Sequence, residues 1–403
     1  MTSEGHANQA TAAASASKPR PKLSKRLLRA SPVIAALMIL LWVFGHTGVL
    51  HKIETTVSNV QMRLNKPISD SPVVIVDIDD ADYRELFNET SPLEPSRLEK
   101  LISDISKGQP RVIGVDIDTS SPRFATEFTV GNWGPHIVWE REIRGVPVEG
   151  TDDLKLSPVD ILGGETNIDP KRNSAGLPIL FDESEDKVTR KYRRYLSTDA
   201  APLPSFPYAI AEAYRGETLN APAGLEDWQQ DRLIRFSGIP GHTARLHFSA
   251  RKVTELSQHW PDASPIKDKI VLLGGSYLGQ DRHDTPIGEL SGVEVMANVV
   301  ETELVGGGER PPSKTVLLLL ELFEAFVLIL LFHILKFRFA LLWSLVLVPV
   351  IAVLCSALAY RDTRHFIQFA FILLGLLLFE LYGHFRRSAV PSLYHDIAGA
   401  SHG

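Results

Sequence analysis

The sequence predicts an α/β domain with a mostly parallel sheet, together with four transmembrane helices, one before the domain and three after it. Residues 73–80 (VVIVDIDD) and 111–118 (RVIGVDID) predict the sheet, because each is an apolar, largely β-branched run that ends in acidic residues. Such runs are typical of strands buried on both faces. Long apolar runs at 32–50 and beyond residue 315 predict the membrane helices.

An amphipathic helix is predicted between the two strands, over residues 95–107. Its apolar residues recur at helical spacing: Leu98, Leu101, Ile102 and Ile105. Pro95 suits the first turn and Gly108 suits the position just past the end. Strand, helix and strand with short connections form a βαβ unit, so the strands should run parallel. If they are neighbours, Asp77 and Asp116 lie one strand spacing, roughly 5 Å, apart.

Further elements follow in the polar middle of the chain. Short apolar runs predict strands at 137–139, 231–236 and 269–273. Apolar residues at helical spacing predict helices at 206–214 and 293–304. The acidic 182–186 and basic 190–194 segments predict an edge hairpin or a solvated strand.

Composition limits the classes of protein to which the chain can belong. The net charge of the 403 residues is −6, which argues against a general nucleic-acid binder. Cys355 is the single cysteine, so an intramolecular disulfide and a two-cysteine zinc site are both excluded.

The hydropathy pattern predicts how the chain is organised around a membrane. A basic arm precedes the first apolar run, and the positive-inside rule then places both termini in the cytoplasm. The alternative for that run is a cleaved signal peptide. The predicted parts are a disordered arm (1–31), a span (32–50), an extracytoplasmic domain (51–314), three spans (315–335, 339–360 and 364–382) and a cytoplasmic tail (383–403).

Acidic residues gather after the first two predicted strands, as Asp77 and Asp79 and as Asp116 and Asp118. In open α/β sheets, ligands bind beyond the carboxyl ends of the strands, so all four are candidate ligand-binding residues. If a metal binds, oxygen ligands such as Asp77 and Asp116 favour Ca²⁺ or Mg²⁺. The alternatives are helix capping, pairing with basic side chains, or catalysis.

Two later motifs are further candidates for ligand binding. Gly274-Gly275-Ser276 follows a predicted strand and could offer backbone N–H groups to an anion, although a tight turn is the alternative. Asp284 and Thr285 lie in a polar segment with Asp281 and His283, where a metal site or a side-chain-stabilised turn could form.

Two acidic residues, Glu321 and Glu324, lie within the predicted span 315–335. They are three residues apart and therefore share a helix face. A carboxylate in hydrocarbon usually faces protein or water. Glu321 and Glu324 are either a packing contact between spans or a switch that couples the outer domain to the inner face.

No set of residues in the sequence predicts catalysis. The chain has neither G-x-S-x-G nor H-E-x-x-H, and Cys355 lies in a predicted span. Its histidines are scattered without ligand spacing. We therefore expect a protein that is not an enzyme and that has no cofactor.

The motifs together resemble the second type of CHASE domain, a bacterial sensory extracellular module associated with cyclases and histidine kinases. The resemblance runs from residue 53 to residue 307. It is carried by residues 73–79, 111–118, 269–276 (KIVLLGGS), 284–286 (DTP) and 292–298 (GVEVMAN). One span before the domain and three after it are also this family's usual layout.

The resemblance implies a sensory, ligand-binding protein of bacterial signal transduction in the cytoplasmic membrane. The expected ligand is an unidentified small molecule or ion. The tail at 383–403 is too short for a folded output domain, so we expect a separate cytoplasmic or membrane signalling partner. Sensors of this layout are often dimers, which makes a homodimer a further expectation. The alternative functions are an extracytoplasmic metal-dependent hydrolase and a non-signalling membrane scaffold.

Overall fold

The structure is a computed structural model of the chain. It describes residues 59, 62, 70–147, 154–164, 169, 171–182, 186–198, 201–217, 219, 230–237, 245–260 and 264–308. All of these belong to one of the two compact units of the chain, the unit that contains Lys52–Phe323. The four predicted spans lie outside the described residues. None of the described helices is long and apolar enough to cross a bilayer.

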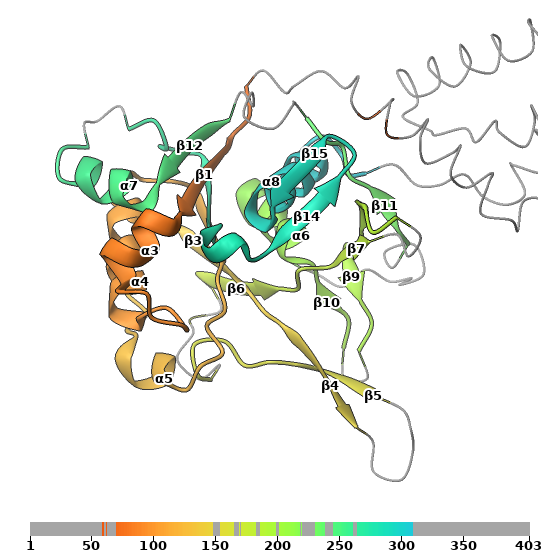
Figure 1. The fold of residues 1–403 in the computed structure, drawn as a ribbon, viewed down its shortest axis with the longest axis horizontal. Coiled ribbons are helices and arrows are strands. Elements are labelled where there is room, and N and C mark those ends of the chain that lie inside the picture. The colour runs from red at the N-terminus through yellow and green to blue at the C-terminus, as the bar shows by residue number, and fades with distance from the viewer. Residues whose placement is uncertain are drawn as a thin grey trace, which may run out of the picture. The chain divides into compact units, whose positions relative to one another are not determined.

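A parallel sheet of six strands forms the centre of the described unit (Figure 1). Its order is β12-β1-β13-β2-β3-β6, and every neighbouring pair is parallel. The strands are β1 (Val73–Ile78), β2 (Val112–Asp116), β3 (His136–Glu140), β6 (Asn173–Gly176), β12 (Leu246–Ser249) and β13 (Ile270–Gly275). The sheet is mostly parallel, as the sequence predicts.

Helices cover both faces of the sheet, and alternate strand residues pack against them. On one face, Val74 and Val76 pack with α3 (Asp80–Phe87), α4 (Pro95–Ser106), α5 (Arg123–Glu127) and α7 (Ala250–Ser257). On the other face, Val73 and Ile75 pack with α6 (Phe206–Arg215) and α8 (Gly292–Leu304). Both faces are buried, which explains why the central strands are continuous apolar runs.

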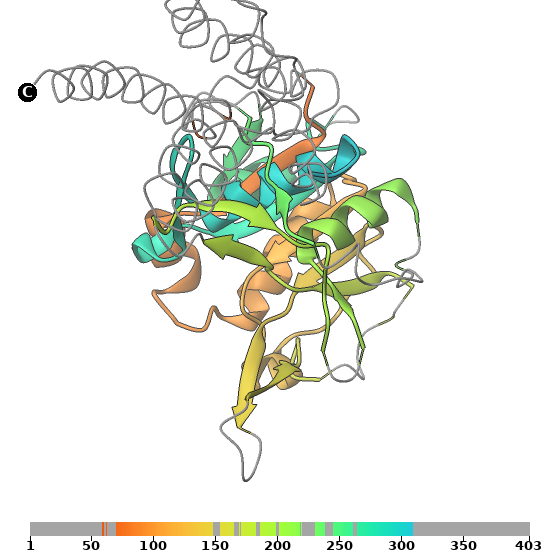
Figure 2. The ribbon, with the colours of Figure 1, turned by 90° about the vertical axis from the view of Figure 1, so that its right-hand side faces the viewer.

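Smaller sheets surround the central one. β7 (Leu180–Asp182), β8 (Thr189–Tyr192) and β11 (Arg232–Leu233) form an antiparallel sheet, and β9 (Tyr195–Leu196) pairs with β10 (Leu203–Pro204). β14 (Arg282–Thr285) and β15 (Gly288–Ser291) form a hairpin that leads into α8. A second hairpin, β4 (Ile143–Pro147) with β5 (Leu154–Pro158), projects from the body of the unit (Figure 2).

The predicted strands 73–80 and 111–118 are confirmed as β1 and β2, but they are not neighbours. β13 lies between them, so Asp77 and Asp116 are each paired with Gly274 rather than with each other. The two aspartates are therefore two strand spacings apart. The βαβ rule gives the parallel direction of two strands, but a strand from nearly 200 residues later can insert between them.

The predicted helices at 95–107, 206–214 and 293–304 are confirmed as α4, α6 and α8. The acidic and basic segments do lie at an antiparallel hairpin, β7 with β8, but β8 is the central strand of its small sheet and Arg190 is buried, so the basic segment is neither an edge strand nor a solvated one. The strand predicted at 231–236 is shorter, since only Arg232–Leu233 pairs with β8. Helix α3 has no counterpart among the predicted helices, and its first turn continues the acidic stretch after β1 with Asp80 and Asp82.

Candidate functional site

A row of residues crosses the sheet at the carboxyl ends of its central strands. Asp77 on β1 pairs with Gly274 on β13, and Gly274 pairs with Asp116 on β2. Val115 pairs with Trp139 on β3, so the next position along brings Glu140 beside Asp116. Side chains alternate between the two faces of a strand, and the residues of this row lie on the face that α6 and α8 cover.

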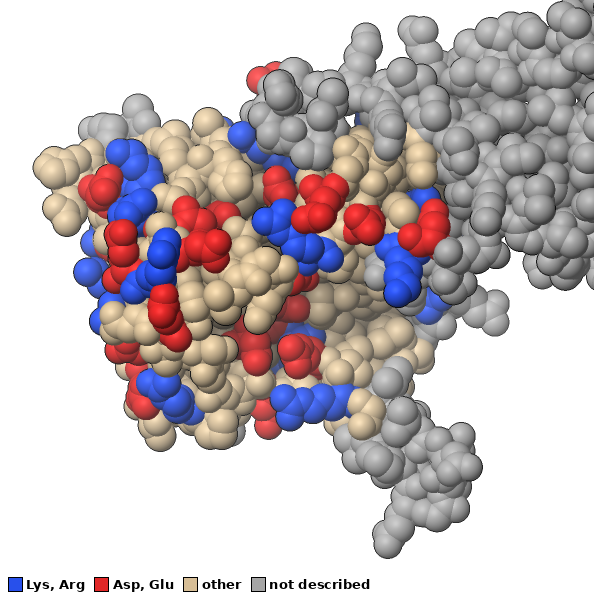
Figure 3. Space-filling model, in the orientation of Figure 1, with Lys and Arg blue, Asp and Glu red and all other residues tan. Residues whose placement is uncertain are grey.

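A pocket of about 540 Å³ opens beside this row. Five of its residues are acidic, and they come from β2, β3 and the segments that follow β2, β3 and β13. Acidic side chains gather around a hollow on this side of the surface (Figure 3). The lining residues are Asp116, Ile117, Asp118, Glu140, Glu142, Pro178, Leu180, Gly275, Tyr277, Gln280, Asp281, His283 and Met296.

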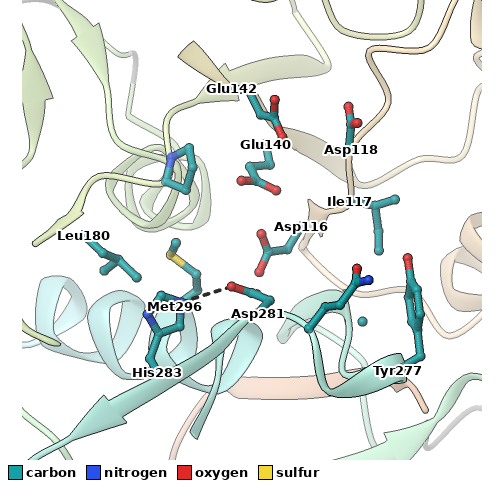
Figure 4. A pocket seen from close by; sticks show the side chains of 13 residues that line it. Asp116, Ile117, Asp118, Glu140, Glu142, Leu180, Tyr277, Asp281, His283 and Met296 are labelled. Carbon is teal, nitrogen blue, oxygen red and sulfur yellow. Dashed lines mark hydrogen bonds and ion pairs between the residues drawn. The ribbon is translucent and has the colours of Figure 1, made fainter. Parts of the chain in front are cut away.

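The carboxyl groups of Asp116 and Glu140 form the centre of the pocket (Figure 4). Burial raises the pKa of Asp116 to about 6, although a hydrogen bond from Glu140 opposes that rise. Burial and the charge of Asp116 raise the pKa of Glu140 well above its ordinary value. The two carboxyls are thus coupled, and burial and their mutual repulsion favour one proton held between them.

Asp281 and His283 form the opposite wall of the pocket (Figure 4). Nε2 of His283 lies 3.0 Å from Oδ1 of Asp281, and its Nδ1 lies 3.3 Å from Oγ1 of Thr189 on β8. The charge of Asp281 raises the pKa of both Asp116 and Glu140. Thr189 is only 1% exposed, so this threonine–histidine–aspartate arrangement offers no hydroxyl to a substrate.

The loop between β13 and β14 is held in place by the acidic residues that follow β1. Ser276 donates a hydrogen bond of 2.6 Å to Asp77, and the backbone N–H of Leu278 donates one of 2.7 Å to Asp80. Tyr277, which lines the pocket, stacks on Tyr83 of α3 with ring centroids 4.3 Å apart. These contacts fix one rim of the pocket.

The predicted acidic candidates thus have different surroundings. Asp116 and Asp118 line the pocket, whereas Asp77 lies beyond Gly274 and does not. Burial raises the pKa of Asp77, and His247 lies 3.9 Å from it. Asp79 caps α3 by accepting hydrogen bonds of 2.8 Å from the backbone of Ala81 and Asp82.

The remaining candidates take part in turns and close packing. Asp118 accepts a hydrogen bond of 2.8 Å from the backbone N–H of Ser120. Asp284 is exposed on β14, and the hydroxyl of Thr285 donates to the carbonyl of Gly288 within the hairpin turn. A side chain at Gly274 would lie 2.6 Å from Cβ of Val293, so this glycine allows α8 to pack closely on β13.

Sequence reasoning did not select Glu140 and Glu142 as site residues, and it considered Asp281 and His283 only as part of a possible metal site or a side-chain-stabilised turn. Glu140 directly follows the predicted strand 137–139, so the rule that ligands bind beyond carboxyl strand ends could also have selected it. Asp281 and His283 were recognised as a polar segment, but their approach to β2 and β3 depends on β13 lying beside β2. That strand order does not follow from any local pattern.

The chemistry of this pocket suits a positively charged ligand. Carboxyl groups that share a proton in a half-buried site are stabilised by an incoming cation or by a further proton. Within the described part of the chain, no group of three or more metal-ligating side chains has the geometry to hold a metal ion. The pair of metal candidates, Asp77 and Asp116, is separated by Gly274. Glu321 and Glu324 lie outside the described residues.

A polar pocket beyond the carboxyl ends of a parallel sheet is the usual place for a ligand in an α/β domain. The chain belongs to the CHASE2 domain family, whose model matches residues 33–337. CHASE2 domains are sensory domains of signal transduction rather than catalytic ones. No curated protein and no solved structure matched the chain.

Proposed function

We propose that this protein is a membrane-anchored, extracytoplasmic sensor of bacterial signal transduction that binds a cationic small molecule or ion in its acidic pocket. The bound state is relayed to a separate cytoplasmic or membrane signalling protein. The observation that carries the proposal is the pocket itself, with Asp116, Glu140 and Asp281 converging at the carboxyl edge of the sheet.

Electrostatics support a cationic ligand. Asp118 and Glu142 add their charges at the rim, and His283 pairs with Asp281 on the far wall. Each carboxylate raises the free energy of ionising its neighbours, so a cation that enters the pocket relieves repulsion as well as forming its own contacts. That gain exists only in the folded domain, because the acidic residues are far apart in sequence.

Membership of the CHASE2 family supports the sensory role, and the sequence supports the membrane anchors. Apolar runs at 32–50, 315–335, 339–360 and 364–382 are each about as long as a bilayer requires. A sensor acts when its ligand has different affinities for two states of the domain. Movement at the ends of residues 51–314 would then reach the membrane segments.

Thermal unfolding of the detergent-solubilised full chain tests the ligand proposal. The probes are Mg²⁺, Ca²⁺ and spermidine, each titrated at pH 7 and constant ionic strength. A ligand that binds only the folded state at 100 times its Kd stabilises it by about 2.7 kcal/mol, which raises Tm by several degrees. We expect such a rise for at least one probe, and we expect its loss in the double variant Asp116→Asn/Glu140→Gln.

A matched variant separates binding in the pocket from general charge effects. Glu255→Gln removes an exposed carboxylate on α7 and should leave the rise in Tm intact. If no probe raises Tm, or if Glu255→Gln abolishes the rise as fully as the pocket variant does, the pocket is not the binding site. Absence of binding would favour the non-signalling scaffold. Metal-dependent hydrolysis of ester substrates that is lost in Asp116→Asn would favour the enzyme.

The separate output partner needs its own test. Photo-crosslinking groups in the predicted tail, residues 383–403, should capture a kinase, a cyclase or another signalling protein in living cells. Crosslinking groups on the exposed hairpin β4–β5 should not capture that protein. Recovery of no signalling protein from the tail under several growth conditions would overturn the proposed relay.

A further inference from the structure

Helix α8 begins at the pocket. Met296 lines the pocket, and the backbone N–H of Gly292 donates a hydrogen bond of 2.8 Å to the carbonyl of Asp281. A side chain at Gly292 would lie 1.7 Å from a carboxylate oxygen of Asp281, so the acidic residue sits directly over the first turn. Any change in the position of Asp281 therefore acts on the start of α8.

The other end of α8 carries a buried ion pair. Glu301 is 1% exposed and accepts hydrogen bonds of 2.6 Å from both Nε and Nη2 of Arg245. Ser237 donates to the same carboxylate at 2.9 Å, and Ser71 donates to it at 2.5 Å. Ser71 lies two residues before Val73, the first residue of β1, so Glu301 holds the entry of the chain into the sheet.

A second buried carboxylate holds the exit of the chain. Glu303 is fully buried and accepts hydrogen bonds from Arg194 at 2.8 and 2.6 Å and from the hydroxyl of Tyr192. That hydroxyl accepts a hydrogen bond of 2.9 Å from the backbone N–H of Gly308. The backbone N–H of Gly307 donates to the carbonyl of Thr302 at 2.9 Å.

The entry of the chain at Ser71 and its exit at Gly308 are thus both attached to the last turn of α8. The first turn of the same helix contacts the pocket. The 13 residues of α8 span about 20 Å. Buried ion pairs resist intermediate positions, because a partly separated pair leaves charges without partners in an apolar environment. Such a contact therefore shifts between discrete arrangements rather than deforming gradually.

We propose that α8 couples the acidic pocket to the entry and exit of the domain, with Arg245 as the positioning residue that holds Glu301 to the entry. This inference rests on the proposed function and names α8 as the element that transmits ligand binding to the ends of the domain. A cation that draws Asp281 toward Asp116 and Glu140 shifts the first turn of α8, and the buried carboxylates carry the shift to Ser71 and Gly308.

Hydrogen exchange of the full chain in lipid nanodiscs tests this coupling without a ligand. Asp116→Asn/Glu140→Gln removes the pocket charge that repels Asp281. We expect amide exchange at residues 306–308 to change at least about five-fold, the lower end of typical coupling between sites. Exchange within α4, on the opposite face of the sheet, should stay the same. Glu255→Gln is the matched control and should change neither segment.

A second variant tests the role of Arg245. Arg245→Lys keeps the charge but cannot form the two parallel bonds to Glu301. In this background, the pocket variant should no longer alter exchange at the entry, residues 71–78, while residues 306–308 still respond through Glu303. If Arg245→Lys fails to fold, Ser237→Ala serves instead, because it removes one donor to Glu301. In that background, the pocket variant should alter exchange at residues 71–78 less than it does in the parent chain.

Two results would overturn the coupling. One is unchanged exchange at residues 306–308 in a pocket variant whose α4 exchange shows that it is folded. The other is a uniform rise in exchange across all helices, which would show a merely structural role. Failure of every cation to raise Tm would instead reject the proposed ligand and leave the coupling standing, so the two failures are distinguishable.

Discussion

Asp116 and Glu140 show how two ordinary residues acquire unusual chemistry from their position. Each is the last residue of an apolar strand, and each would ionise readily in water. Side by side in a half-buried pocket, they cannot both carry a charge without losing solvation and repelling one another. Sharing a proton resolves this conflict, and it leaves the pair sensitive to any cation or pH change at the mouth of the pocket.

The shared proton predicts a specific pH dependence of stability. Both carboxyls have a higher pKa in the folded state, Asp116 about 6 against an ordinary 3.8. Their contribution to stability is therefore fully present below pH 4 and is lost as the pH rises through about 6 and beyond. Asp116→Asn should raise stability by roughly 1–2 kcal/mol at pH 8, allowing for solvent screening, and by nothing below pH 4.

Thermal unfolding at pH 4, 6 and 8 measures this difference. The other groups that face the pair, Asp118, Glu142, Asp281 and His283, are retained in Asp116→Asn, so the difference between the two proteins reports the Asp116 carboxyl together with its interactions with these groups. Glu255→Gln should show no pH-dependent gain. A variant that is less stable than the parent at pH 8 would show that Asp116 and Glu140 do not compete for a proton.

Leu278 has a strained backbone conformation, and substitution can measure the free energy of that strain. Its φ is 58°, in the left-handed region, and the side chain is 60% exposed on the rim loop of the pocket. Asparagine adopts this conformation more readily than leucine. We expect Leu278→Asn to raise the free energy of unfolding by about 0.5–1 kcal/mol, measured by urea denaturation. Destabilisation by Leu278→Asn would indicate that the leucine side chain contributes to packing.

At the scale of elements, sequence patterns predicted the central strands and three of the helices because each carries its own signal. α4 combines Pro95 at its start with apolar residues at helical spacing, and the apolar run of β13 stops at two glycines. β12 has no such signal, since Leu246 and His247 are exposed at an edge of the sheet. Short edge strands depend on tertiary pairing rather than on local composition.

The candidate site was predicted only in part, for a physical reason that concerns strand order. The rule that ligands bind beyond carboxyl strand ends selected Asp116 and Asp118, which do line the pocket. It also selected Asp77 and Asp79, which instead hold the rim loop and cap α3. Local sequence gives the end of each strand, but which ends converge depends on long-range pairing.

The contact between β13 and α8 makes a prediction about Gly274. An alanine Cβ there would lie 2.6 Å from Cβ of Val293, an atom fixed close to the helix backbone. Gly274→Ala should lower the free energy of unfolding by about 1–3 kcal/mol, because the helix must move away from the sheet. Thermal unfolding measures the loss. Gly145→Ala on the exposed hairpin β4–β5 is the control and should change stability by less than about 0.5 kcal/mol.

At the scale of the whole molecule, the relation between the domain and the membrane decides what the acidic pocket can sense. CHASE2 domains are sensory modules, and a sensor outside the cytoplasmic membrane meets environmental cations and pH directly. The predicted topology follows from the basic arm before residue 32 and from an even number of predicted spans. Cysteine labelling tests this topology directly.

The single cysteine makes that labelling straightforward. Cys355→Ala gives a cysteine-free chain, into which Asn132→Cys places a thiol on an exposed turn of the sensory domain and Ser401→Cys places one in the predicted tail. In spheroplasts, a membrane-impermeant maleimide should label Asn132→Cys at once and Ser401→Cys only after the membrane is opened. Labelling of Asn132→Cys only after opening would put the domain in the cytoplasm and would remove the basis for an extracytoplasmic sensor. Immediate labelling of both positions would mean that an even number of segments crosses the bilayer between them, as when one of the three apolar runs after residue 314 does not insert.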